Sequence, residues 1–243
     1  MYYAIIAAGE GSRLRNEGID APKPLVRIGG RTLIERLIEI FRSQADCEAV
    51  SVIISPEVAA QAPKLDADHV VTASTGGSME SLQRLAPFLK GCVRFCLTTV
   101  DTVFVREEFD RYMEAFRKGY EEGYDGCMGV TTYVDDEKPL YVVTDADDTV
   151  TGYFDTPPEG VRYVSGGIYG LPESALDVLD ECMASGKRRM RDLQRALIAS
   201  GMRLKAWPLG CVIDIDHAAD IEKAARLISG EAATGTAQPP ASS

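Results

Sequence analysis

The sequence predicts an α/β protein in which helices cover both faces of a mostly parallel sheet. Two observations support this prediction. Short apolar runs end in loops rich in Gly, Ser or Asp, and segments with helical apolar spacing lie between them. The connections are short, so each helix carries the chain back to start a new strand parallel to the previous one.

The alternation is clearest at the start of the chain. The apolar run at 4–8 and the β-branched run at 50–54 are predicted strands, and a shorter strand is expected at 70–71. Thr32 and Glu35 have the spacing of a capping box, which predicts that a helix begins there.

The next segments continue the pattern. Ser78 is predicted to be the N-cap of a helix that ends before Pro87. The apolar run at 93–100 predicts a strand that ends at Asp101, and a further helix is expected to close at Gly119.

The second half of the chain has a different character. We expect a hairpin from 140–144 and 149–154, then a strand at 164–171 in which Gly166 and Gly167 allow close approach of the backbone to a ligand. The other expected elements are strands at 126–134, 204–208 and 212–215, a helix that opens with Pro172, and helices at 190–200 and 218–228.

Composition excludes several classes of protein. The chain has 243 residues, which suffices for one sizeable core, and a net charge of -11, which argues against a nucleic-acid or anionic-membrane surface. No leader pattern or apolar run of about 18 residues is present, so a cytoplasmic protein is expected. The chain has six cysteines without a C-x-x-C pair and only two histidines, which argues against a zinc site.

The loop after the first strand carries the strongest chemical signal. Gly9 and Gly11 can bring backbone N–H groups close to an anion, Arg13 follows, and Lys23 lies between two prolines that favour extended backbone. Two cations and glycine amides suit a nucleoside triphosphate, although a tight turn with solvated cations is an alternative. Leu14 replaces the third glycine of a dinucleotide fingerprint, and the spacing to Lys23 does not match a P-loop.

Carboxylates follow two other predicted strands. Asp101 comes at the carboxyl end of a buried strand, where α/β sheets bind ligands, and suits a Mg²⁺ ion, although a turn or cap role is also possible. Asp214 and Asp216 end the last predicted strand, and alternation places both on one face. Asp216 could also cap the final helix.

Five segments, in order, resemble the nucleotidyltransferase superfamily that includes sugar-1-phosphate nucleotidylyltransferases, CTP:phosphocholine cytidylyltransferase and molybdopterin guanylyltransferases. They are AAGEGSRL…PKPL, STGGSMESL, LTTVDTVF, VSGGIYGL and DIDHAADIEKA. The resemblance implies a GT-A-like, Rossmann-like three-layer α/β/α fold with a mixed, mostly parallel sheet and a small inserted acceptor-binding β subdomain. We expect one domain over 1–230, with a nucleotide-binding half at about 1–125 and an acceptor-binding half at about 126–230, and a disordered tail at 231–243.

The resemblance also implies a role for each matching residue. Arg13 and Lys23 would be catalytic, neutralising charge on the phosphates, and Asp101 and Asp216 would hold Mg²⁺. The implied nucleotide-binding residues are Ala8, Gly9, Gly11, Ser12, Gly76, Gly77 and Ser78. The implied acceptor-binding residues are Ser165, Gly167 and Arg162.

The acceptor segments depart from the family pattern. The family often has E-K-P after the hairpin, with a lysine that contacts the acceptor phosphate, but Asp155-Thr156-Pro157 stands there in this chain. The usual acceptor-strand Asn is Ser165. Arg162 or the basic cluster at 187–189 could supply the missing cation, although such a cluster is more typical of a solvated helix start. The literal E-K-P at 137–139 precedes the hairpin and is expected to be coincidental.

Together these features predict a Mg²⁺-dependent nucleotidylyltransferase that joins an NTP to a sugar 1-phosphate and releases pyrophosphate, giving an NDP-sugar. We expect a monomer or homodimer without nucleic-acid or membrane partners. A phosphocholine-type acceptor, a glycosyltransferase using Asp214 and Asp216 as a D-x-D motif, and a non-catalytic nucleotide-binding homologue are alternatives. The glycosyltransferase leaves Arg13 and Lys23 without a role. A non-catalytic homologue would not need both of these cations together with Asp101 and Asp216.

Overall fold

The computed structural model describes residues 1–9, 11–133 and 138–230. Its main sheet has nine strands: β1 (Tyr2–Ala7), β4 (Ala49–Ile54), β5 (His69–Thr72), β6 (Arg94–Thr99), β8 (Gly126–Thr131), β9 (Tyr141–Thr144), β10 (Val150–Phe154), β11 (Tyr163–Pro172) and β12 (Leu204–Leu209). The helices are α1 (Ser12–Asn16), α2 (Leu33–Arg42), α3 (Pro56–Gln61), α4 (Ser78–Leu85), α5 (Arg106–Glu121), α6 (Ala175–Ala184), α7 (Met190–Ala199) and α8 (Ala218–Ser229). Two short ribbons complete the fold: β2 (Arg27–Ile28) with β3 (Arg31–Thr32), and β7 (Thr102–Val103) with β13 (Ile213–Asp214).

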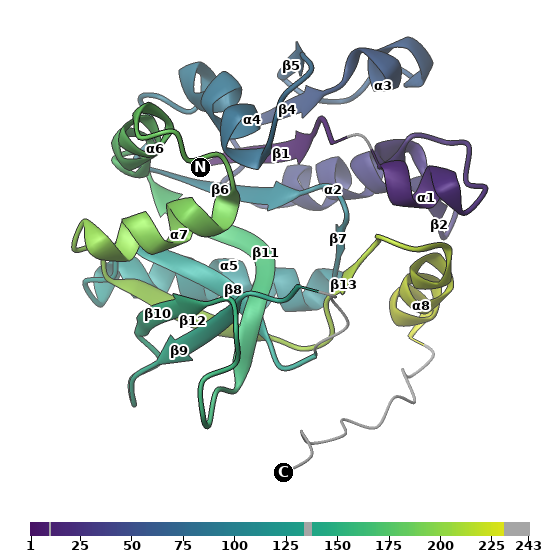
Figure 1. The fold of residues 1–243 in the computed structure, drawn as a ribbon. Coiled ribbons are helices and arrows are strands. Elements are labelled where there is room, and N and C mark those ends of the chain that lie inside the picture. Colours follow the sequence, from purple (N-terminus) through teal and green to yellow (C-terminus); the bar gives the residue numbers. More distant parts are fainter. Residues whose placement is uncertain (10, 134–137, 231–243) are drawn as a thin grey trace.

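The strand order is β10-β9-β11-β6-β1-β4-β5, and β8 lies between β11 and β12 (Figure 1). β1 runs parallel to β4 and β6, and β4 runs parallel to β5, as the alternating pattern predicts. β11 is antiparallel to β6, β8 and β9, which makes the sheet mixed. The expected hairpin is confirmed, because β9 and β10 pair antiparallel.

Alternation along β1 explains why helices cover both faces. Tyr3 and Ile5 join a core cluster with α2 and α5, whereas Ala4 and Ile6 join a second cluster with α4, α6 and α7. The first cluster contains a series of ring contacts in which Phe41 packs against Tyr3. The resulting three layers, visible in Figure 1, confirm the predicted α/β/α fold class.

The capping box at the start of α2 is confirmed. The Thr32 hydroxyl accepts a bond from the Glu35 N–H, and the Glu35 carboxylate accepts one from the Thr32 N–H. Asp148 in the β9–β10 turn has a positive φ of 58°. An aspartate tolerates this left-handed conformation in a tight turn.

Three predicted helix ends are wrong. Gly77, not Ser78, is the N-cap of α4, and Ser78 is its first helical residue. α5 continues through the buried Gly119 to Glu121, since the left-handed position that a helix end favours is taken by Gly123 (φ 82°). Pro172 ends β11, in register with β6, so it does not open α6.

The sheet is continuous across the expected boundary near residue 125, because β11 pairs with both β6 and β8. Within the described ranges, none of the helices combines the length and apolar character needed to cross a membrane. The strand expected at 126–134 ends earlier, at Thr131, because residues 132 and 133 do not continue β8. The expected tail at 231–243 lies outside the described residues.

Candidate active site

The fold brings four predicted charged residues together at the carboxyl ends of β1 and β6. The Lys23 ammonium donates to Asp101 Oδ2 at 2.9 Å and to Asp216 Oδ1 at 2.7 Å. The Arg13 guanidinium donates to the other oxygen of Asp216, also at 2.7 Å. In Figure 1 both strands point toward the side of the molecule that carries α1 and α8. The four side chains therefore form one contiguous ionic network.

The close approach of two loops explains the position of the cations. Gly11 has a φ of 58°, and a Cβ added there would lie 3.0 Å from the Lys23 Cβ. A glycine at this position therefore lets the loop after β1 lie against Lys23. Lys23 opens a short 3-10 helix, Lys23–Leu25, so the extended backbone expected there is wrong. Arg13 lies in the short helix α1, whose buried Leu14 anchors it to the core.

The small ribbon of β7 and β13 explains the position of the carboxylates. Thr102 pairs with Asp214, and the Ile215 N–H donates to the Asp101 carbonyl at 3.0 Å, so the chain after β13 runs beside Asp101. Asp216 then lies at the ionic network. The N-cap of α8 is His217, so the alternative role of Asp216 as that helix cap is wrong.

The network favours the charged forms of Lys23 and Asp101. Only 14% of the Lys23 side chain is exposed, and burial alone would lower its pKa, but the carboxylates of Asp101 and Asp216 outweigh burial and raise it. Burial would raise the pKa of Asp101, but the Lys23 ammonium holds it below its usual value.

The two carboxylates also have the chemistry of a magnesium site. Both bind the same ammonium, so their oxygens converge on one cationic position. Mg²⁺ is commonly held by one or two carboxylates together with substrate phosphate oxygens. The donor set therefore fits the predicted ion, with Lys23 between the carboxylates of Asp101 and Asp216.

The loop predicted to meet the nucleotide packs against the segment before α7. The Ser78 hydroxyl accepts a bond from the Met190 N–H at 3.1 Å, and the Met79 N–H donates to the Arg188 carbonyl at 3.4 Å. A Cβ added to Gly77 would lie 2.8 Å from that carbonyl, so only glycine fits without a shift. The Gly76 N–H donates to the Glu80 carboxylate at 2.8 Å.

The other predicted nucleotide-binding residues lie around the start of α1. Ala8 is buried just after β1, and a Cβ added to Gly9 would meet no atom within 4 Å. Ser12 is the first residue of α1 and immediately precedes Arg13. These residues therefore lie on the segment that connects β1 to Arg13.

A cavity of about 340 Å³ connects the predicted nucleotide and acceptor residues. Its lining includes Ser78, Asp101, Ser165, Gly167 and Asp214. Gly167 has a φ of 72°, and a Cβ there would lie 2.4 Å from the Thr102 hydroxyl, so glycine is required at this bend of β11. The Ser165 hydroxyl donates to the Gln194 side chain at 3.2 Å.

Arg162 does not accompany Ser165 and Gly167 into this cavity. Its guanidinium lies 3.5 Å from Asp148 and packs over the ring of Tyr163 at 5.0 Å from the ring centroid. Asp148 lies in the β9–β10 turn and Tyr163 is the next residue of the chain. Neither contact brings Arg162 to the cavity, so the structure gives no support to its predicted acceptor role.

Other cations line the cavity instead: Lys138, Arg189 and Arg191. Lys138 belongs to the E-K-P segment at 137–139, which the sequence pattern suggests is coincidental. The first residue of that segment, Glu137, lies outside the described residues. Of the cluster at 187–189, Arg189 is at the cavity, whereas the Arg188 guanidinium donates to the carbonyls of Met183 and Lys187. Sequence reasoning missed Arg191, because an arginine on an amphipathic helix looks like part of a solvated face.

Comparison with known proteins identifies relatives over most of this chain. A family model described as a MobA-like NTP transferase domain matches residues 3–199. A bifunctional IPC transferase and DIPP synthase from Rubrobacter xylanophilus is 26% identical over 256 residues, which cover 97% of this chain and 54% of that protein. This chain thus spans about half the length of that curated relative.

Two solved structures share the fold. An inositol-1-phosphate CTP transferase from T. maritima has a TM-score of 0.75 at 19% identity, covering 94% of both chains. A CTP:phosphocholine cytidylyltransferase from Streptococcus pneumoniae has a TM-score of 0.71 at 17% identity, covering 93% of this chain and 98% of the other. At these identities the likeness concerns the fold alone.

Proposed function

The chain belongs to the MobA-like NTP transferase family, and from this premise we propose that it transfers a nucleotidyl group from an NTP to the phosphate of a cyclic polyol. A sugar 1-phosphate or an inositol 1-phosphate would be the acceptor, and pyrophosphate the second product. One observation carries the proposal: Lys23, Arg13, Asp101 and Asp216 form a network beside a cavity lined by further cations. Anionic groups of two substrates can meet there.

The reaction needs positioning and charge stabilisation more than proton transfer. An oxygen of the acceptor phosphate, already anionic at neutral pH, attacks the α-phosphorus of the NTP. The bond from this phosphorus to the bridging oxygen of the β-phosphate breaks, and pyrophosphate leaves with the electron pair. Arg13 and Lys23 would bind the phosphate oxygens on which negative charge accumulates. No general base is required.

Magnesium remains part of the proposal. Asp101 and Asp216 would hold the ion, which when bound supplies further positive charge to the phosphate oxygens. Lys23 would then exchange its carboxylate partners for phosphate oxygens. Its raised pKa supports this role, because the ammonium stays charged throughout the neutral range.

The cations of the cavity suit the phosphate of the acceptor. Lys138, Arg189 and Arg191 attract a phosphate, and the same lining holds the carboxylates of Asp101 and Asp214, so the name of a solved relative, and not charge, selects the first acceptor to test. Both solved structures are named for enzymes that use CTP, and one is named for inositol 1-phosphate, so these two substrates are the first pair to test.

A pyrophosphate-release screen tests the function. CTP, UTP, GTP, ATP and dTTP would each be combined with glucose 1-phosphate, inositol 1-phosphate and phosphocholine in the presence of Mg²⁺. We expect release with one base and a polyol phosphate, with formation of the corresponding nucleotide diester. Consumption of a nucleotide sugar without an NTP would favour the glycosyltransferase, and no release with any pair would favour a non-catalytic homologue.

A further inference from the structure

The place where the family carries its acceptor lysine has the opposite charge in this chain. Asp155 stands there, after β10, and its carboxylate binds two arginines of α7, Arg191 and Arg195. We propose that Arg191, positioned by Asp155, binds the phosphate of the acceptor and so replaces the missing lysine. This inference rests on the proposed function and assigns a specificity residue to it.

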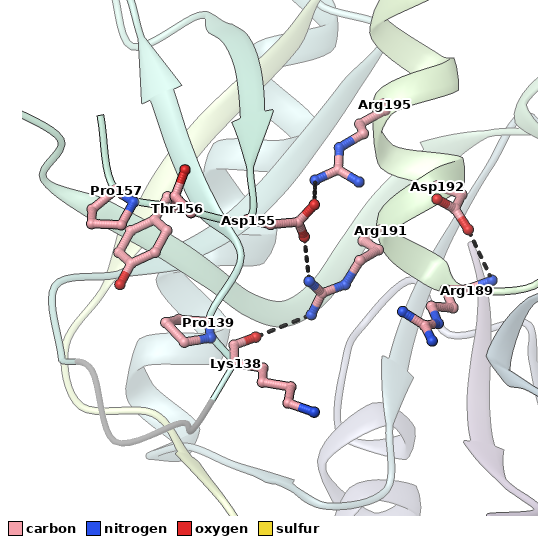
Figure 2. A pocket seen from close by; sticks show the side chains of 10 residues that line it. Lys138, Pro139, Asp155, Thr156, Pro157, Arg189, Arg191, Asp192 and Arg195 are labelled. Carbon is pink, nitrogen blue, oxygen red and sulfur yellow. Dashed lines mark hydrogen bonds and ion pairs between the residues drawn. The ribbon is translucent and has the colours of Figure 1, made fainter. Parts of the chain in front are cut away.

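The Arg191 guanidinium is held from two sides. One of its nitrogens donates to Asp155 Oδ1, and the other donates to the Lys138 carbonyl at 3.0 Å (Figure 2). Arg195, one helical turn further along α7, occupies Asp155 Oδ2 at 2.7 Å and also donates to the Tyr153 carbonyl at 3.2 Å. A single carboxylate thus fixes two side chains of one helix against the hairpin.

Arg191 lies where two cavities meet. It lines the cavity of about 340 Å³ that contains Asp101, and also a neighbouring cavity of about 580 Å³ that contains Asp155 and Arg195. Figure 2 shows Arg191 between Lys138 and Arg189, which likewise line both cavities. Arg191 can therefore contact a phosphate near Asp101, whereas Asp155 acts on the substrate only through Arg191 and is a positioning residue.

The guanidinium groups of the outer cavity suit a phosphate monoester. Among the described residues, its lining includes the cations Lys138, Arg189, Arg191 and Arg195 and the carboxylates Asp155 and Asp192. A phosphate monoester carries between one and two negative charges near neutral pH. A guanidinium can bind it with two parallel hydrogen bonds, which an ammonium cannot do.

The Asp155 contacts persist at neutral pH. Arg191 and Arg195 hold the pKa of the Asp155 carboxyl below its usual value, because both donate hydrogen bonds to the ionised form. The carboxylate therefore keeps Arg191 in place under the conditions of the reaction.

Steady-state kinetics of three variants test the inference. In Arg191→Ala we expect the KM for the polyol phosphate to rise about 10- to 100-fold, as for the loss of a hydrogen bond to a charged group, while the KM for the NTP changes less than about twofold. On a logarithmic scale, the KM of Arg191→Lys for the polyol phosphate should lie closer to that of Arg191→Ala than to that of the unaltered protein. Lysine cannot bind Asp155 and a phosphate as a planar fork. Asp155→Asn should raise the same KM by about three- to tenfold with kcat less affected.

Arg106→Ala is the matched control, because Arg106 is an exposed arginine at the start of α5, paired with Asp110 and outside both cavities. Its kinetic constants should equal those of the unaltered protein. An unchanged acceptor KM in Arg191→Ala, or equal rises in the KM of acceptor and NTP, would overturn the inference while the proposed function stands. If the unaltered protein releases no pyrophosphate, the proposed function fails. Calorimetric titration with inositol 1-phosphate then decides the inference: binding weakened at least tenfold by Arg191→Ala supports it, and binding that is absent or unchanged rejects it.

Discussion

The two ends of the proposed site handle charge differently. At the nucleotide end, Arg13 and Lys23 face Asp101 and Asp216, so two cations and two carboxylates balance within this four-residue network. At the acceptor end, two guanidinium groups, those of Arg191 and Arg195, share the single carboxylate of Asp155. The nucleotide end is thus balanced within its four-residue network, whereas at the acceptor end one carboxylate serves two cations.

This difference predicts how each substrate would bind. A triphosphate would have to compete with Asp101 and Asp216 for Lys23, and replacing buried ion pairs requires partners of similar quality. Magnesium would compensate, since it gives the released carboxylates a new cation. An acceptor phosphate could enter without breaking the contacts of Arg191 to Asp155 and Lys138, because the guanidinium has further N–H groups.

Removing a cation from the balanced end should have the largest effect. We expect Lys23→Ala or Arg13→Ala to lower turnover by at least about 100-fold, because each loses a preorganised contact to the transition-state charge, worth about 3 kcal/mol or more. Initial rates of pyrophosphate release measure this effect. Circular dichroism should show an unchanged fold.

Arg15→Ala is the control for this prediction. Arg15 lies in α1 two residues after Arg13, but pairs with the exposed Glu57 at 2.8 Å. Its removal should leave turnover unchanged. Near-normal turnover in both Lys23→Ala and Arg13→Ala would contradict the assignment of the network to the reaction.

The balanced end was predictable from sequence, and most of the acceptor end was not. Asp101 follows a clear strand and Lys23 lies in a recognisable proline-flanked loop, so local patterns and the family resemblance located both. Arg191 contacts Asp155 across 36 residues, and only the packing of α7 on the hairpin brings them together. Arg162 has the right charge near the acceptor strand, but its guanidinium lies 3.5 Å from Asp148.

The two ends of the site also touch, because the loop before α4 packs against the segment before α7. Gly77→Ala tests whether this contact matters for both substrates. The new Cβ would lie 2.8 Å from the Arg188 carbonyl, so the loop before α4 or the start of α7 must shift. We expect the KM values of both NTP and acceptor to rise about tenfold, and the free energy of unfolding to fall by about 1–3 kcal/mol from overpacking.

Gly210→Ala is a matched substitution, since its Cβ would meet no atom closer than 3.5 Å and it lines neither cavity. It should change neither KM. A rise in only one KM with Gly77→Ala would show that the two ends respond separately, and the acceptor residues Arg189 and Arg191 would then not depend on this contact.

A charge cluster near the amino end of β1 should affect stability without affecting either end of the site. Asp46 accepts two hydrogen bonds from Arg117, at 2.9 and 2.7 Å, and one from the Tyr3 hydroxyl at 3.2 Å. Burial alone would raise the pKa of Asp46, but these donors hold it below its usual value.

Asp46→Asn should therefore lower the free energy of unfolding by about 1–2 kcal/mol at pH 7, with unchanged kinetic constants. A carboxyl whose pKa is lower in the folded state stabilises the protein fully above its unfolded pKa, and this contribution disappears as the pH falls through the folded pKa. Urea titrations at several pH values should thus show the difference between the two proteins shrinking below about pH 4. If the difference persisted in strong acid, packing and not charge would account for it. If the acceptor KM also rose, the separation between this cluster and the site would be disproved.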